Sequence, residues 1–341
     1  YGALALWDYA AAAPYVGIDM NPAINDSDCS KDAVFISPHK FIGGQGTPGV
    51  LVVKKHLLTN TVPSVVGGGT VSYVSPDSHS YVSDAVRREE GGTPAIVESI
   101  RAGLVFKLQQ QVGTDLIEQK EHDFVSRALA RWSDNENIEV LGDLSADRLS
   151  IVSMRIKHKG RDLHYGFVVA LLNDLFGIQP RGGCSCAGPY GHSLLNIDRD
   201  MSNKLAAEID KGSMMLRPGW TRLNFNYFIS EEVFDYIVSA IELVAEYGWK
   251  LLPYYSFSPT SATWLYQARP MQLVSDLASV DFNADSSDVA VSYGDDLREY
   301  LAKARLLLTE PLEATTYCVD LTDNANTLRW FWLPQELALI A

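Results

Sequence analysis

"DAVFISPHKFIGGQG", residues 32–46, is the stretch that sets the expected fold of this 341-residue chain. Its run AVFIS has the β-branched and aromatic content of a buried strand, so Lys40 is expected at a strand end and not on a solvated helix face. Such a lysine either marks where the strand leaves the core or carries chemistry there. These residues alone leave both interpretations open.

The residues on either side extend the pattern to a sheet. ALALWDYAAAAPY, at residues 3–15, predicts a strand that ends at Asp8, and GVLVVKK, at residues 49–55, predicts another. Open α/β sheets place their chemistry at the carboxyl ends of strands. We therefore expect an α/β domain in which Asp8 and Lys40 belong to adjacent strands.

The composition and net charge of the chain limit the kinds of molecule that it is expected to bind. The chain has 47% hydrophobic residues and carries 42 acidic against 28 basic residues, a formal net charge of -14. This balance argues against non-specific binding to nucleic acid or to an anionic membrane, and no apolar run approaches the ~20 residues that span a bilayer. Four cysteines form no disulfide framework in a chain this long. We expect a soluble cytoplasmic protein, in a reducing compartment, that acts on a small molecule or binds protein partners.

A glycine motif follows Lys40 but does not indicate a dinucleotide site. GQGTPG, at residues 44–49, fits the spacing G-x-G-x-x-G. That motif requires a helix after its last glycine, with its N-terminus facing the pyrophosphate. Here the strand predicted over VLVVKK follows at once. The turn either keeps the backbone clear of a bound ligand or is a plain loop.

The middle of the chain predicts two helices with a domain boundary between them. RREEGGTPAIVESIRAGLVFKL, at residues 87–108, leads into a helix that starts near Pro94 and continues to about Gln111. Thr93 can cap this helix or bind an anion at its N-terminus. A second amphipathic helix begins within GTDLIEQKEHDFVSRALARW, at residues 113–132. The boundary is expected at residues 112 and 113.

Short strands and a helix precede the most unusual loop. IEVLGD, LSIVSMRIKHKG and RDLHYG predict strands, and FVVALLNDLFG predicts a helix that ends at Gly177. IQPRGGCSCAGPYGH then gathers Arg181, Cys184, Cys186 and His192 in a loop rich in glycine and proline. An arginine beside an exposed thiol favours a reactive cysteine. Inert buried thiols are the alternative, and the other cysteines and histidines lack the companion spacing of a metal site.

The order of these motifs resembles a known family. The pieces are Asp8 at a strand end, SPHK, GGG, EGGTP, RGGCSCAGP and GWTRLNF. They occur in the same order in the class V aminotransferase group of pyridoxal-phosphate (PLP) enzymes of fold type I, especially the cysteine desulfurases and selenocysteine lyases. The resemblance extends to about residue 255. It implies part of a PLP-dependent transferase large domain with a mostly parallel sheet, followed by a small α+β C-terminal domain.

The resemblance assigns cofactor roles by position. It makes Lys40 the lysine that forms the Schiff base with the aldehyde of pyridoxal 5'-phosphate, and a buried amine of lowered pKa suits that role. Asp8 matches the carboxylate that pairs with the protonated pyridine nitrogen. Ser37 and His39 match phosphate-binding positions. Thr93 matches a threonine that reaches the phosphate of the neighbouring subunit's cofactor, which implies a homodimer.

The same resemblance assigns the substrate residues. Arg222, in TRLNF, resembles the arginine that clamps the α-carboxylate of an amino-acid substrate, and Arg181 shares that task or holds the loop. Cys186 falls where desulfurases keep the thiol that attacks substrate sulfur and becomes a persulfide, which is then passed to a sulfur-acceptor protein. Cys184 is a resolving partner or a bystander. No metal is implied.

The sequence also departs from the family. Ala11 stands where relatives often carry a glutamine that faces the phenolic oxygen of the cofactor. Relatives also have a long segment before the aspartate, which carries a ring-stacking side chain and a Gly-Thr phosphate turn. The resemblance therefore covers the second half of the catalytic fold.

The expected organisation has three parts. Residues 1–112 form a partial PLP-binding large domain, residues 113–255 a small domain with the arginine and cysteine loop, and residues 256–341 an extension. In the extension, SFSPTSATWLYQARP predicts a loop and LREYLAKARLLLTE a helix. LRWFWLP predicts an aromatic strand or docking segment that packs against the small domain, with a partner-binding patch as the alternative.

Two classes of function remain open. The favoured one is a PLP-dependent lyase or transferase of the cysteine desulfurase type, with an aminotransferase or epimerase without sulfur transfer as its rival. The other is a truncated or degenerate homologue that is not catalytic. Intact Lys40, Asp8 and Arg222 favour the enzyme.

Overall fold

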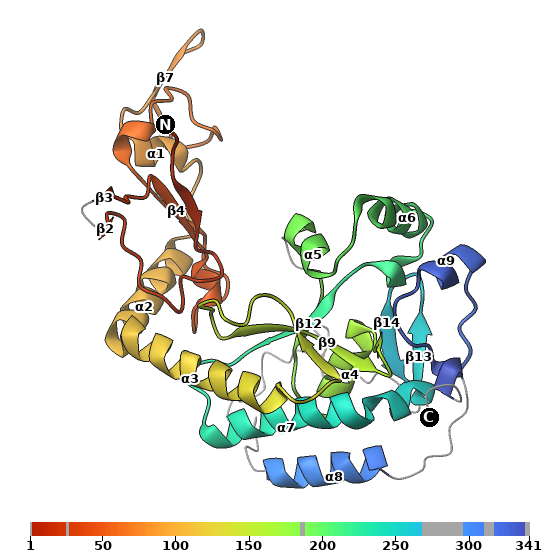
Figure 1. Ribbon diagram of the computed structural model, residues 1–341. Helices are drawn as coiled ribbons and strands as arrows, with labels where there is room; N and C mark the ends of the chain where they lie inside the picture. The colour runs from red at the N-terminus through yellow and green to blue at the C-terminus, as the bar shows by residue number, and fades with distance from the viewer. Residues whose placement is uncertain (1, 25–26, 185–187, 268–295, 310–316, 338–341) are drawn as a thin grey trace, which may run out of the picture. The chain divides into compact units, whose positions relative to one another are not determined.

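The computed structural model describes residues 2–24, 27–184, 188–267, 296–309 and 317–337 (Figure 1). The chain forms two compact units, residues 1–120 (unit 1) and 121–341 (unit 2), and the division falls within α3 (Thr114–Trp132). The sequence places a boundary slightly earlier, and its three-part division stays a prediction. No helix within the described ranges has the length and apolar character needed to cross a membrane.

Unit 1 contains the predicted sheet around Lys40. The sheet has the order β1 (Leu6–Asp8), β4 (Ala33–Ile36), β5 (Val50–Val53). β1 runs parallel to β4, which confirms that Asp8 and Lys40 follow adjacent strands. β4 and β5 are antiparallel, because the loop between them contains no crossover helix that would return the chain to the other end of the sheet. The α/β class is confirmed, with one parallel and one antiparallel strand pair here.

The other elements of unit 1 are short apart from α2 (Ile96–Val112), which packs on Phe41 through Val105. They are β2 (Ala23–Ile24), β3 (Ser27–Asp28), η1 (Pro38–Lys40), η2 (Lys55–Leu57), β6 (Val71–Val74), β7 (His79–Tyr81) and α1 (Ala85–Glu89).

Unit 2 is built on a five-stranded antiparallel sheet. Its order is β10 (Arg161–Asp162), β9 (Ile151–His158), β12 (Trp220–Asn224), β11 (Arg181–Gly183), and β8 (Ile138–Val140) also pairs with β9. Side chains alternate along β9: Val152, Met154 and Ile156 are buried, while the residues between them face away from the core. The strand predicted over RDLHYG is shorter than expected, because His164 already caps α4 (Tyr165–Phe176) by accepting a hydrogen bond from Gly166.

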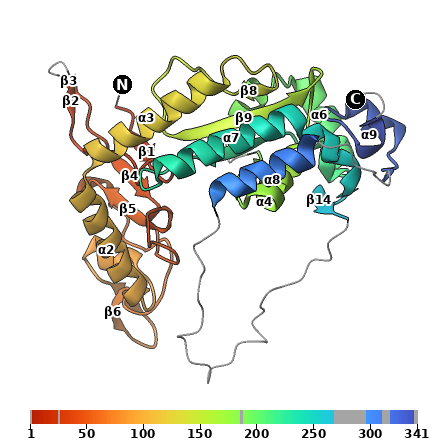
Figure 2. The ribbon, with the colours of Figure 1, turned by 90° about the horizontal axis from the view of Figure 1, so that it is seen from below.

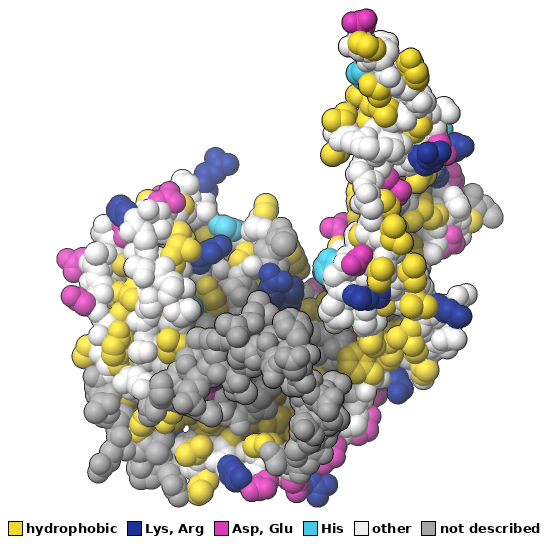
Figure 3. All heavy atoms as spheres, turned by 180° about the vertical axis from the view of Figure 1, so that it is seen from behind, with side chains coloured by type: hydrophobic (Ala, Val, Ile, Leu, Met, Phe, Trp, Pro, Cys, Tyr) yellow, Lys and Arg dark blue, Asp and Glu magenta, His cyan; other side chains and the backbone are white. Residues whose placement is uncertain are grey.

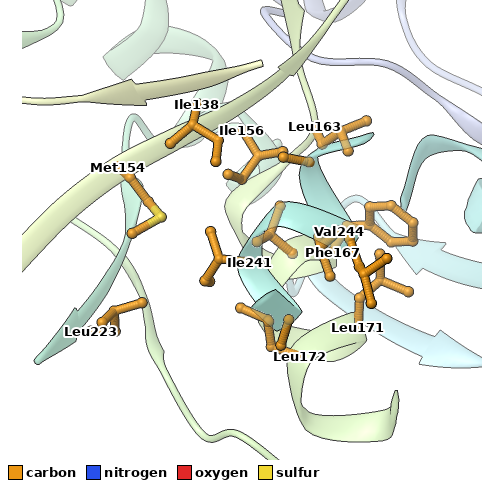
Figure 4. Packing of buried hydrophobic residues seen from close by; sticks show 14 of the residues in the cluster. Ile138, Met154, Ile156, Leu163, Phe167, Leu171, Leu172, Leu223, Ile241 and Val244 are labelled. Atoms are coloured by element: carbon orange, nitrogen blue, oxygen red, sulfur yellow. The ribbon is translucent and has the colours of Figure 1, made fainter. Parts of the chain in front are cut away.

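Helices cover the buried face of this sheet. α4, α7 (Glu231–Tyr247) and α8 (Leu297–Thr309) contact one another (Figure 2). α4 also packs directly on β9, β11 and β12. The apolar side chains of α4 and α7 meet those of the strands in one core (Figure 4). As predicted, α4 ends at Gly177, whose φ of 64° is the left-handed conformation that favours glycine at a helix end.

The remaining elements of unit 2 are α5 (Gly188–Leu194), α6 (Arg199–Ile209), η3 (Met214–Leu216), η4 (Gly248–Tyr254), β13 (Tyr255–Ser258), β14 (Thr263–Tyr266), α9 (Asp323–Leu328) and η7 (Pro334–Glu336).

The C-terminal extension is integrated into unit 2. The prediction of a loop over residues 256–270 is wrong for its described part: β13 and β14 form a hairpin, since Phe257 and Trp264 alternate into the core and stack with ring centroids 4.4 Å apart. The predicted helix is α8. The WFW segment docks as predicted, with Phe331 fully buried and the Trp332 amide donating to the carbonyl of Asp162 at 3.0 Å.

A buried histidine lies at the centre of this docking. The Nδ1 atom of His164 accepts hydrogen bonds from the Gly166 amide (3.0 Å) and from the Trp264 indole (3.1 Å). Its ring stacks on Trp330, with centroids 5.4 Å apart. Burial lowers the pKa of His164 to about 3, so the ring stays neutral and acts as an acceptor that ties the extension to α4.

Candidate functional site

The predicted cofactor residues of unit 1 lie at the carboxyl ends of two neighbouring strands. In the parallel pair of β1 and β4, Asp8 lies opposite Phe35, two residues before Ser37. The amide of Tyr9 donates to the Phe35 carbonyl at 2.9 Å and continues the pairing past Asp8. The Oδ1 atom of Asp8 accepts from the Ala10 amide at 2.8 Å, which orients the carboxylate. One sheet therefore brings together a carboxylate and the turn that carries Ser37, His39 and Lys40.

Lys40 lies on η1, a single 3-10 turn directly after β4. Gly44 fixes this turn: a Cβ atom at position 44 would lie 1.9 Å from the Pro38 carbonyl oxygen, so only glycine permits the approach. The side chains of His39 and Lys40 are exposed, whereas a buried amine is expected for a Schiff-base lysine. The contact of Gly44 with Pro38 therefore assigns the glycines directly after Lys40 to the turn. As predicted, the strand β5 follows this loop, and no helix does.

The loop after Lys40 is anchored on α2. The buried ring of Phe41 packs edge-on against Phe106, with centroids 5.2 Å apart. Arg101 donates to the carbonyl of Gln45 at 2.8 Å. Both contacts come from one helix, so the backbone on the C-terminal side of Lys40 is held to a rigid element.

The two later glycine clusters lie against each other. A Cβ atom on Gly67 would lie 2.9 Å from the Gly92 amide nitrogen, and that amide donates to the Gly68 carbonyl at 2.9 Å. The prediction that Thr93 caps α2 is wrong: the N-cap is Ala95, without a side-chain hydrogen bond, because its ψ of 79° keeps the chain out of the helix until Ile96. Thr93 is exposed beside this glycine contact.

In unit 2, the two predicted substrate arginines lie side by side. β11 and β12 pair antiparallel with Arg181 directly opposite Arg222, and Arg222 in turn lies opposite Ser153 of β9. Cross-strand partners point to the same face, and this is the face away from α4, because Thr221 and Met154 at the alternate positions are buried. Arg181 is exposed and Arg222 is half-buried.

The electrostatics of this face distinguish the arginine pair from its neighbours. Arg155 pairs with Asp162 at 2.8 Å and with Glu139 at 3.0 Å, and Lys157 pairs with Glu139 at 2.6 Å. Within the described ranges, neither Arg181 nor Arg222 has an ion pair or a side-chain hydrogen bond. Like charges directly opposite each other destabilise a sheet. Two adjacent guanidinium groups without a carboxylate form a natural site for a small anion, which Arg binds in bidentate geometry.

The cysteine loop is only partly described. Cys184 directly follows β11 and is exposed, as are Cys29 and Cys318. Cys186 lies outside the described residues, so its predicted role stays a prediction. His192 does not face an open site, since its ring bonds the Gly188 carbonyl and the Ser202 hydroxyl, each at 2.9 Å. Among the residues described, no group of three or more His, Cys, Asp or Glu side chains could hold a metal ion.

The structure thus gathers the predicted residues into two sets, one in each unit. Asp8, Ser37, His39 and Lys40 share the sheet edge of unit 1, and Arg181 and Arg222 share the outer face of the unit 2 sheet. Ser153 was not predicted from the sequence, although its place in the alternating pattern of β9 puts a small side chain beside Arg222.

Comparison with known proteins identifies relatives of the chain. A probable cysteine desulfurase of Halobacterium salinarum is 26% identical over 230 residues, which are 64% of this chain and 52% of that protein. A probable cysteine desulfurase of Halalkalibacterium halodurans is 33% identical over 189 residues, 55% of this chain and 43% of that protein. The chain therefore spans about half the length of the curated relatives that it matches.

Solved structures support the fold. The apo structure of a cysteine desulfurase from Thermococcus onnurineus matches with a TM-score of 0.55 and 24% identity, over 72% of this chain and 53% of that one. The cysteine desulfurase CsdA of Escherichia coli matches with a TM-score of 0.52 and 21% identity, over 72% of this chain and 52% of that one. Residues 1–202, more than half of the chain, match the family model described as Aminotransferase class-V. The chain belongs to the class V aminotransferase family.

Proposed function

We propose that this chain is part of a PLP-dependent enzyme that acts on an amino acid, and that its reaction is sulfur transfer of the cysteine desulfurase type. The observation that carries the proposal is the parallel pairing of β1 with β4, which places Asp8 beside the turn that bears Lys40. The relatives named as cysteine desulfurases support the choice of reaction.

The residues at this sheet edge fit pyridoxal phosphate. Asp8 is oriented through one oxygen by the Ala10 amide, and its other oxygen has no partner among the described residues. Ser37 occupies the N-cap of η1 without using its side chain there, so its hydroxyl is open to a ligand. His39 and Lys40 are exposed on the same turn. The donor set comprises an amine, a carboxylate, a hydroxyl and an imidazole, which are the groups that the aldehyde, the pyridine nitrogen and the phosphate require.

Each side chain has a definite task in this proposal. When bound, the cofactor supplies an electron sink for negative charge at the substrate α-carbon. Asp8 holds the proton on the pyridine nitrogen, and Ser37 and His39 donate hydrogen bonds to the phosphate. The Lys40 amine binds the cofactor aldehyde and moves a proton at the α-carbon.

The arginine pair and the cysteine loop complete the assignment. Arg222 and Arg181 bind the α-carboxylate of the substrate. The Cys186 thiolate takes the sulfur of cysteine as the carbon–sulfur bond breaks, so a persulfide forms and alanine leaves. A sulfur-acceptor protein then removes the persulfide sulfur. The thiols of Cys29 and Cys318 are free and exposed, which supports a reducing compartment, and we propose the cytoplasm.

Borohydride labelling tests the cofactor assignment. Pyridoxal phosphate added to the chain should give a yellow species, and reduction should attach the cofactor to Lys40, because its turn faces the open sheet edge. Peptide mass spectrometry locates the label. The exposed lysine Lys55 of the same unit provides the control: Lys55→Ala should keep the label at Lys40, and Lys40→Ala should lose it. A label on another lysine contradicts the assignment.

The partner that we propose for unit 1 is a second copy of the chain. Thr93 is exposed, and α2 directly after it carries an exposed apolar stripe at four-residue spacing, formed by Ile96, Ile100, Leu104 and Leu108, which are 40–62% exposed. Figure 3 shows hydrophobic side chains on the surface of this unit. A stripe of this length next to the threonine supports an interface that brings Thr93 toward the partner's cofactor phosphate.

Replacing an apolar residue of this stripe should therefore weaken the dimer. Leu104→Glu should shift the protein from dimer to monomer at micromolar concentration, because a carboxylate would be buried in the interface. The control Ser99→Glu adds a carboxylate at an exposed position of the same helix, on a different side from Leu104 and outside the stripe. Sedimentation velocity measures both. A Leu104→Glu protein that stays dimeric rules out this face.

A further inference from the structure

The strand that carries Arg181 is weakly held by its own sheet. β11 has only three residues and lies at the edge of the sheet, where β12 is its one partner among the described strands. A short edge strand with two glycines has little side-chain packing to fix its position. Yet Arg181 is placed opposite Arg222, so another contact must hold the strand.

The ring of Tyr165 supplies this contact from the α4 side. A Cβ atom on Gly182 would lie 3.0 Å from the Tyr165 ring and 3.1 Å from Val169. A Cβ atom on Gly219, which directly precedes β12, would lie 2.7 Å from the same ring and 2.7 Å from the backbone of Gly183. Both glycines therefore lie against one aromatic surface, and a larger side chain at either position would push β11 off it.

The C-terminal extension backs this ring. The indole of Trp330 stacks on Tyr165 with centroids 6.0 Å apart and planes 22° apart, and the adjacent Phe331 is fully buried. Burial also raises the pKa of the Tyr165 phenol, so the ring stays neutral. A continuous stack thus runs from residue 330 through residue 165 to the glycines of β11.

We propose that Tyr165 and Trp330 are positioning residues that hold β11 so that Arg181 and Arg222 receive one carboxylate together. The inference rests on the proposed function for the identity of the carboxylate, an amino-acid substrate. It gives the extension, which lies beyond the family match, an indirect part in substrate binding, through the position of β11.

Hydrogen exchange of the whole chain tests the positioning without any turnover. Trp330→Leu should raise exchange at residues 181–183 by about tenfold, since the strand loses its support, while β9 and β12 stay protected. Trp332→Leu is the matched control, because the Trp332 ring lies under Arg161 and its indole donates to the His158 carbonyl, whereas the described ring contacts of Tyr165 are with His164 and Trp330. It should leave exchange at residues 181–183 unchanged.

Steady-state kinetics of the PLP-loaded protein supplies the second readout. Tyr165→Leu should raise KM for the amino acid by about tenfold and change kcat by less than about twofold, because it disturbs binding of the carboxylate and not the reacting atoms. Tyr165→Phe keeps the ring and should restore the wild-type KM.

The outcomes separate the two proposals. Two results of the exchange comparison overturn the positioning role. One is a rise across the whole sheet in both Trp330→Leu and Trp332→Leu, and the other is a rise at residues 181–183 that is equal in the two variants. A fall in kcat alone in Tyr165→Leu also overturns it. A protein without turnover on any amino acid refutes the proposed function, and the exchange comparison still decides whether Trp330 holds β11.

Discussion

Cys186→Ala should abolish formation of both persulfide and alanine from cysteine, a loss of at least about 10³-fold, while pyridoxal phosphate still attaches to Lys40. Sulfur transfer needs a nucleophile that takes the sulfur as the carbon–sulfur bond breaks. Transamination or epimerisation needs no such thiol. Alanine release and persulfide content, measured on the PLP-loaded protein, therefore separate the two kinds of reaction.

Cys184 offers the matched control for this experiment. It is an exposed cysteine that directly follows β11 and lies two residues before Cys186. Cys184→Ala should retain most of the alanine release, because the family resemblance places the attacking thiol at position 186. Undiminished alanine release by Cys186→Ala would instead favour an aminotransferase or epimerase.

The sheet around Lys40 was predictable because its signals are local. The apolar runs that end at Asp8, at Ser37 and before Lys54 are each short and bounded by polar residues or turns, and the structure has a strand in each. The glycine motif after Lys40 was also interpreted correctly from the strand that follows it. The exposure of Lys40 was not predictable, because burial depends on which distant segments cover a strand end.

The start of α2 and the hairpin of the extension show where local signals fail. Thr-Pro before a helical pattern is typical of an N-cap followed by the first helical residue, yet the helix begins at Ile96. The hairpin of β13, β14 and the turn between them contains Ser, Pro and Thr at turn-like density. The strand character of β13 and β14 comes from burying Phe257 and Trp264 against distant residues.

The arginine pair depends on register, which the sequence does not contain. Both arginines were singled out one by one through family motifs. Their direct pairing follows only from the antiparallel alignment of β11 with β12, and Ser153 joins them through the alignment of β12 with β9. The contrast with the ion-paired Arg155 and Lys157 likewise needed the structure.

Arg222→Gln should lower kcat/KM for the amino acid by about a hundredfold, because a charge-assisted hydrogen bond to the carboxylate is lost and glutamine cannot replace the bidentate fork. Arg181→Gln should act in the same direction. The double variant should lose less than the product of the two single losses if both arginines bind one carboxylate, as we propose. Steady-state kinetics on the four proteins gives this coupling, and Lys157→Gln, which removes a cation of the same outer face, should leave kcat/KM unchanged.

Although Arg222→Gln should lower kcat/KM, it should raise the free energy of unfolding. This combination distinguishes a pair of arginines that binds a ligand from a pair that stabilises the fold. Removing one of two like charges that lie directly opposite each other should raise the free energy of unfolding by about 0.2–1 kcal/mol at low ionic strength. Lys157→Gln should lower it, because that change breaks the 2.6 Å ion pair with Glu139. Thermal unfolding at low and high salt measures both variants. If Arg222→Gln instead destabilises the protein as Lys157→Gln does, then Arg222 has a structural partner and the pair is not kept for an anion.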